Sequence, residues 1–105
     1  MEQMERIARL KEILIQSPND GFVLYSLGME YASMNDSKTA LKYFQQVLKN
    51  DPDCVACYYQ KALAHLKVSQ NSEAKITLEA GIPKAVEANQ FHTRDKMKQL
   101  LKKIG

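Results

Sequence analysis

A period of 34 residues runs through the middle of this chain. Pro18 and Pro52 stand 34 positions apart. The same offset pairs identical or related residues at five other places: Leu24 with Tyr58, Tyr25 with Tyr59, Gly28 with Ala62, Ala40 with Ala74, and Phe44 with Leu78. A fixed period of this length is typical of stacked arrays, in which each unit buries its apolar side against the next. The period therefore predicts a repeat architecture.

Apolar residues recur every three or four positions along most of the chain, which is the spacing of one helix face. Proline, asparagine and aspartate residues separate these segments and supply helix stops and caps. The expected helices are residues 2–16, 21–33, about 37–49, 54–67, about 73–88 and 90–104. The fold class expected from them is all-α, with helices joined as antiparallel helix–turn–helix pairs.

One of these expected helices contains Pro83, which would ordinarily end it. Helical spacing continues across the proline at four apolar positions: Leu78, Ile82, Ala85 and Val86. We therefore expect a kinked helix that continues to about Ala88.

Length and composition limit the class of protein. With 105 residues, of which 45% are hydrophobic and 26% charged, the chain resembles one ordinary soluble domain. No apolar run approaches the roughly 18 residues of a membrane-spanning helix, and the charged first segment lacks the apolar block of a secretory signal. We expect a cytoplasmic protein that does not enter membranes.

Cys54 and Cys57 flank two residues at an expected helix start, an arrangement also found in redox sites. Two cysteines so close in sequence cannot staple a fold, which agrees with a reducing compartment. No strand precedes them, and neither proline nor glycine lies between them. We expect a small buried residue and a half-exposed thiol here, and no redox chemistry.

Candidate metal ligands and catalytic groups are few. A metal site would need ligands beyond the cysteines, and the chain offers His65 and His92. His65 lies on a buried stripe, so a hydrogen-bonded core histidine is expected. Since no nucleophile, base and orienting group can be assembled, we expect no enzyme, no cofactor and no metal.

One stretch of the sequence carries a family resemblance. The pattern consists of Leu24-x-x-Leu27-Gly28-x-x-Tyr31, then Ala40-x-x-x-Phe44, then Pro52. It resembles the tetratricopeptide repeat, with the leading tryptophan replaced. The match is closest over 19–53 and looser from 54 to about 80, where His65 takes the place of the tyrosine. The whole chain is similar to small, free-standing bacterial members of this family.

The resemblance implies a right-handed array of about two repeats with a flanking helix at each end. Residues 1–105 would form one domain, comprising an N-terminal helix (2–16), a first repeat (20–53), an atypical second repeat (54–88) and a C-terminal capping helix (90–104). The opening helix of each repeat would line a concave face that holds peptides or other proteins, without chemistry of its own.

The candidate protein-binding residues are those that the opening helices do not use against their own second helices. They are Phe22, Tyr25, Met29, Ser33, Ala56, Tyr59, Leu63, Leu66 and Lys67. Tyrosine and methionine favour an apolar or helical peptide ligand. Heat-shock co-chaperones of the family hold a terminal carboxylate with lysine and asparagine, but the matching positions here are Tyr25 and Met29. The alternative is that the end helices cover these residues as core.

Two further functions remain open. A short array exposes apolar ends, so the chain could be a structural protein that forms homodimers. Residues 94–105 carry five basic side chains against Asp95, so the last helix could contact an acidic partner or nucleic acid. No aromatic residue lies among these charges, and lysines near a helix end also favour the helix dipole. The leading hypothesis is a non-enzymatic adaptor for a protein or peptide.

Overall fold

The computed structural model describes residues 2–105, and over this range the chain is all-α with six helices. They are α1 (Glu2–Gln16), α2 (Gly21–Ser33), α3 (Ser37–Asn50), α4 (Val55–Lys67), α5 (Asn71–Glu87) and α6 (Phe91–Ile104). The predicted fold class is confirmed. None of the helices formed by residues 2–105 is both long enough and apolar enough to cross a membrane.

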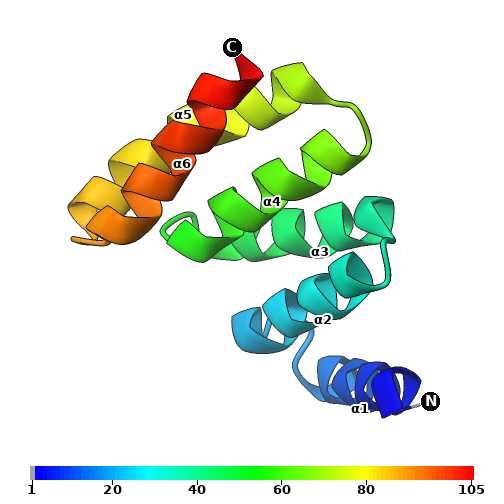
Figure 1. Ribbon diagram of the computed structural model, residues 1–105. Coiled ribbons are helices and arrows are strands. Elements are labelled where there is room, and N and C mark those ends of the chain that lie inside the picture. The colour runs from blue at the N-terminus through cyan, green and yellow to red at the C-terminus, as the bar shows by residue number, and fades with distance from the viewer. Residues whose placement is uncertain (1) are drawn as a thin grey trace.

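The helices are stacked in chain order, with the two termini at opposite ends of the array (Figure 1). The most extensive helix contacts are within the pairs α2–α3 and α4–α5. α1 packs against α2, whereas α6 packs against α5 and also touches α4. The result is an elongated molecule of 39 × 28 × 20 Å.

The turns that follow α2, α4 and α5 each contain one residue in the left-handed backbone conformation. Asn35, Ser69 and Asn89 each follow a helix and have a positive φ, at 64°, 62° and 58°. Asparagine tolerates this left-handed conformation better than most residues. Next to Asn35, the Asp36 side chain accepts a hydrogen bond from the Thr39 amide at 3.2 Å and caps α3. Asn35 and Asp36 are thus a helix stop and a helix cap of the residue types that the sequence predicts between the helices.

The core of the first pair depends on a missing side chain. Gly28 is buried on α2, and a Cβ placed there would lie 2.5 Å from Cε1 of Phe44 on α3. The Phe44 ring therefore occupies the space that a side chain would need. A similar contact exists in the second pair, where a Cβ at Gly81 of α5 would lie 2.6 Å from Cβ of Tyr58 on α4.

Helix α5 continues across Pro83, as the spacing of its apolar residues predicts. Leu78 and Ala85 are fully buried on either side of the proline, whereas Val86 is exposed. The proline side chain is exposed as well, so it does not disturb the packing of the core. Proline has no amide hydrogen to donate to the preceding turn. Packing by Leu78 and Ala85 explains why α5 persists to Glu87.

The Gly28–Phe44 contact leads to a stability prediction. Replacing Gly28 with alanine should lower the free energy of unfolding by about 1–3 kcal/mol, because the new methyl group overpacks the crossing of α2 and α3. Adding Phe44→Leu should restore part of this loss, since Ala62 and Leu78 occupy the corresponding positions of the second pair.

The matched control is Gly21→Ala, because nothing lies within 4 Å of a Cβ at that position. It should leave stability unchanged or slightly higher. Urea unfolding of all four proteins measures these differences. Equal stability of the Gly28→Ala variant and the wild type would contradict the packing argument.

Candidate functional site

The candidate binding residues on α2 form an exposed stripe. We call the nine candidate residues on α2 and α4 the α2–α4 face: Phe22, Tyr25, Met29, Ser33, Ala56, Tyr59, Leu63, Leu66 and Lys67. On α2, Phe22 is 79% exposed and Met29 36% exposed, whereas Leu24 and Leu27 are buried in the core. Because α1 leaves Phe22 open, this half of the face is available to a partner.

Tyr25 lies between these two residues on the helix, but it is half-buried. Its ring packs against Phe44 at a centroid distance of 5.8 Å and an angle of 52°. Burial raises the pKa of the Tyr25 phenol, so the hydroxyl stays protonated and can donate a hydrogen bond. Tyr25 therefore contributes both to the core and to the floor of the face.

The α4 half of the face is partly covered. Ala56 and Lys67 are exposed, whereas Leu63 is half-buried. Tyr59 and Leu66 pack on the core that α4 shares with α5 and α6. The α6 helix therefore covers part of the α4 half and leaves the α2 half open.

A basic residue of α6 defines the edge of this covered half. The Lys96 ammonium lies 4.6 Å from the centroid of the Tyr59 ring, within range of a cation–π interaction. His92 precedes Lys96 by four residues, Gln99 and Lys103 follow it at three- and four-residue spacing, and all three are exposed. The basic residues of this helix are evident in the sequence, but the position of Lys96 beside Tyr59 is not. That contact joins residues 37 positions apart, and the 34-residue period does not indicate it.

Ser33, at the other end of the α2 stripe, is held by α1. Its hydroxyl accepts a hydrogen bond from the Gln3 side-chain amide and donates one to the Glu30 carbonyl at 2.7 Å. Arg6 Nε lies 3.2 Å from Glu30 Oε2, and hydrogen bonds from Arg6 and Gln3 lower the pKa of the Glu30 carboxyl. Ser33 therefore helps to join α1 to α2, and its hydroxyl is already engaged in hydrogen bonds.

A groove accompanies the exposed stripe where α1 meets α2. It has a volume of about 310 Å³ and is lined by Arg6, Arg9, Leu10, Ser26 and Glu30. Ser26 lies between Phe22 and Met29 at helical spacing, so the groove adjoins the open half of the face. The arginines come from α1, which the sequence analysis treated only as a flanking helix.

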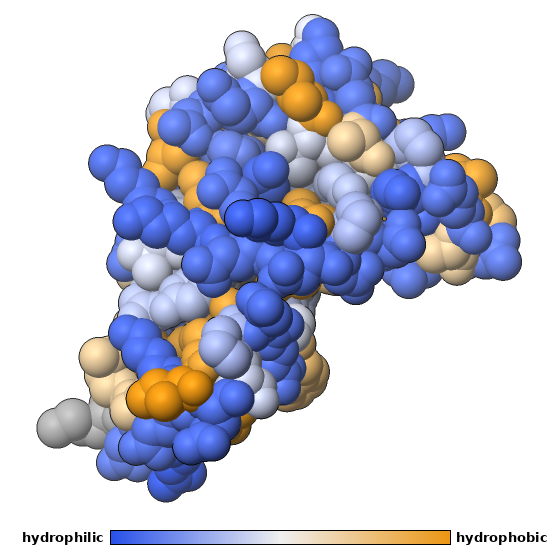
Figure 2. Space-filling model, turned by 180° about the vertical axis from the view of Figure 1, so that it is seen from behind, coloured by the Kyte–Doolittle hydropathy of each residue, from blue (hydrophilic) through white to orange (hydrophobic). Residues whose placement is uncertain are grey.

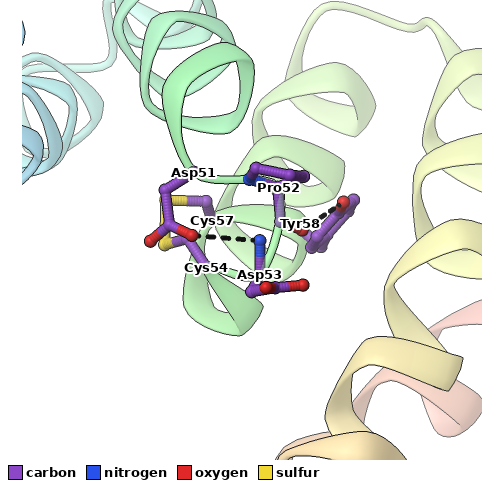
Figure 3. The surroundings of a disulfide bond; sticks show 6 residues. All are labelled: Asp51, Pro52, Asp53, Cys54, Cys57 and Tyr58. Carbon is purple, nitrogen blue, oxygen red and sulfur yellow. Dashed lines mark hydrogen bonds between the residues drawn. A yellow bond between two sulfur atoms is a disulfide. The ribbon is translucent and has the colours of Figure 1, made fainter.

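The structure pairs Cys54 with Cys57 in a disulfide at the start of α4 (Figure 3). The expectation of a half-exposed free thiol at this site is therefore wrong. The expected burial holds for Cys57, which is fully buried, and Cys54 is half-buried. The cysteines are close enough for the bond because the helix start brings their Cα atoms to 5.4 Å, well inside the range of disulfides.

His65 is buried, and its polar side chain has a hydrogen-bond partner within the protein. Its Nδ1 lies 2.7 Å from Oε1 of Gln70, which confirms the prediction of a hydrogen-bonded core histidine. Within residues 2–105, no group of three or more histidine, cysteine, aspartate or glutamate side chains is arranged to hold a metal ion.

The stacked helical pairs place the chain among helical-repeat proteins, and comparisons with known proteins identify the kind of repeat. Residues 22–54 match the family model described as tetratricopeptide repeat. The chain thus contains a segment that matches a tetratricopeptide repeat, and its fold is similar to that of tetratricopeptide repeat domains. No curated protein sequence gives a significant match.

Solved structures share the fold over most of the chain. The TPR2B domain of yeast Sti1, in its complex with pHsp70, matches with a TM-score of 0.89 and 22% identity, over 98% of this chain and 82% of that domain. A tetratricopeptide repeat domain protein from Salinibacter ruber matches with a TM-score of 0.76 and 25% identity, over 83% of this chain and 88% of that one. A protein from Bordetella parapertussis matches with a TM-score of 0.82 and 18% identity, over 93% and 85%.

The two halves of the face should respond differently to truncation. Tyr59→Ala should lower the free energy of unfolding by about 1–3 kcal/mol, because the ring packs on the core of α4, α5 and α6. Phe22→Ala should change it by less than about 0.5 kcal/mol, since the side chain is mostly in water. Urea unfolding provides both values, and equal losses for the two variants would show that the halves are not differently covered.

Proposed function

We propose that this protein is a non-enzymatic interaction module that binds a peptide or helical segment of another protein on the α2–α4 face. The observation that carries the proposal is the exposure of Phe22, at 79%, on the same helix stripe as Met29 and the Tyr25 hydroxyl. Tetratricopeptide repeats are in general protein-interaction modules, which supports this assignment.

The chemistry of the stripe favours an apolar ligand. Phe22 and Met29 offer a ring and a flexible thioether to a partner, and the groove beside Ser26 can receive a side chain. Seen from behind the view of Figure 1, the molecule is mostly hydrophilic, with apolar residues in small separate patches (Figure 2). An apolar face of a helical segment would fit α2 best.

The far end of the face favours acidic groups on the same ligand. Lys67 follows Leu63 by one helical turn on α4, and Lys96 lies over Tyr59 from α6. Lys103 extends this basic stripe along α6. A ligand with apolar residues toward α2 and acidic residues toward α6 would match both ends. The similar yeast domain is described with pHsp70, and the ligand proposed here differs because Tyr25 and Met29 dominate the open half.

A homodimer is the second candidate function, and the first helix of the array favours it. α1 buries Ile7 against α2 but leaves Ile15 78% exposed and Met4 57% exposed. A second copy of the chain could cover these residues. Contact of the basic end with nucleic acid and a cytoplasmic location remain predictions from the sequence.

Selection from a displayed library of about 16-residue peptides, followed by calorimetry with the best peptide, tests the proposed face. The double substitution Phe22→Ala with Met29→Ala should weaken binding at least about tenfold, since aromatic anchors carry much of the binding free energy. Folding should be unaffected, because both side chains are exposed.

Ile76→Ala on α5 is the matched control, because this side chain is also exposed, at 66%, but lies outside the α2–α4 face. It should bind as the wild type does. Full binding by the Phe22/Met29 variant would contradict the proposal. Sedimentation equilibrium of the wild type and an Ile15→Asp variant separates the second candidate, which requires a dimer that this substitution disrupts.

A further inference from the structure

The first turns of α2 and α4, the opening helices of the two repeats, are held by different interactions between residues at equivalent positions. On α2, the carboxylate of the N-cap residue Asp20 accepts a hydrogen bond from the amide of Val23 at 3.2 Å. The residues 34 positions later are Cys54 and Cys57, the N-cap and third helical residue of α4. These are the two cysteines joined by the disulfide. The same pair of positions is thus linked by a hydrogen bond in the first repeat and by a covalent bond in the second.

The start of α4 has no side-chain cap among the described residues, and the Cys57 amide donates a hydrogen bond to the Cys54 carbonyl at 3.1 Å. The Cys54 side chain makes no capping hydrogen bond there. The nearby carboxylate of Asp51 accepts a hydrogen bond from the amide of Asp53 at 3.2 Å and so serves its own turn, as Figure 3 shows. A helix start without a side-chain cap opens more readily than a capped one. The disulfide is therefore the side-chain link between the N-cap residue and the first turn of α4, beside the backbone hydrogen bond.

We propose that Cys54 and Cys57 form a reversible disulfide that replaces the capping hydrogen bond of α4, so that reduction of the pair by a dithiol loosens the first helical turn. This makes the second repeat, and not the first, sensitive to redox conditions. The inference does not depend on the identity of any ligand of the α2–α4 face.

Burial determines which sulfur a reductant can reach. Cys57 is fully buried and belongs to a cluster with Leu24 and Val47, whereas Cys54 is half-buried at the surface. A thiolate of the dithiol therefore attacks Sγ of Cys54, forms a mixed disulfide and releases Cys57 as the thiolate, which takes up a proton. The second thiol of the reductant then attacks the mixed disulfide and releases Cys54. Two electrons and two protons pass to the protein, and the dithiol becomes a cyclic disulfide.

The effect of reduction should be confined to the first turn of α4. The loop before it stays attached by other contacts, since the Tyr58 hydroxyl donates a hydrogen bond to the Pro52 carbonyl at 2.7 Å and Lys84 Nζ lies 2.9 Å from Asp53 Oδ1. Cys57 also remains packed against Leu24 after reduction. The amides of the first turn should therefore open more often while the rest of the array stays folded.

The test compares the wild-type chain after treatment with oxidised glutathione and after treatment with dithiothreitol. Mass spectrometry should show two fewer hydrogens in the oxidised protein. Amide hydrogen exchange from Ala56 to Tyr58 should be faster in the reduced protein, and its melting temperature should be lower by about 4–8 °C. Unchanged exchange and melting, or cysteines that stay reduced in oxidised glutathione, would overturn the proposal.

Two double variants act as matched controls. Cys54→Asp with Cys57→Val copies the cap of the first repeat, and it should resist dithiothreitol and melt near the oxidised wild type. Cys54→Ala with Cys57→Ala removes both kinds of cap, and it should melt near the reduced wild type at all redox conditions. If this alanine variant melted with the oxidised protein, the disulfide would have no capping role.

Discussion

The Phe44 ring lies in the space that a side chain at Gly28 would need, and this packing lets α2 and α3 approach closely where they cross. In the second pair, Ala62 takes the position of the glycine and Leu78 takes the position of the phenylalanine. A larger residue thus replaces the glycine, and a smaller one replaces the phenylalanine. The volume at the crossing is roughly conserved between repeats, which cores tolerate best.

A second exchange of volume occurs nearby. Leu24 and Val47 pack together in the first pair, and 34 positions later stand Tyr58 and Gly81. In both exchanges, the residues of each opening helix lie on the side that packs against other helices. The opposite side of α2 is left without a helix to cover it, and Phe22 and Met29 stand there. The candidate site is thus a consequence of how the repeats pack and of where the array ends.

Much of the fold follows from the sequence, because period, spacing and caps are local signals. Helix limits, the left-handed Asn35 and the buried, hydrogen-bonded His65 were predictable on these grounds. Contacts between distant side chains were not. Neither the tie of Ser33 to Gln3 nor the position of Lys96 over Tyr59 is visible in a helical pattern, since a pattern shows which face is apolar but not what covers it. The disulfide was missed because spacing alone does not say whether two thiols are oxidised.

Among residues 2–105, helices in extensive contact are consecutive in the chain, apart from the smaller contact of α4 with α6. Contacts this local close only short loops, so contact order is low and folding is expected to be fast for a chain of this size. A change at one helix interface should therefore affect mainly the two helices that form it. An opening at one end of the array would therefore weaken the adjacent pair first, and the molecule behaves as a short row of coupled units with no single central nucleus.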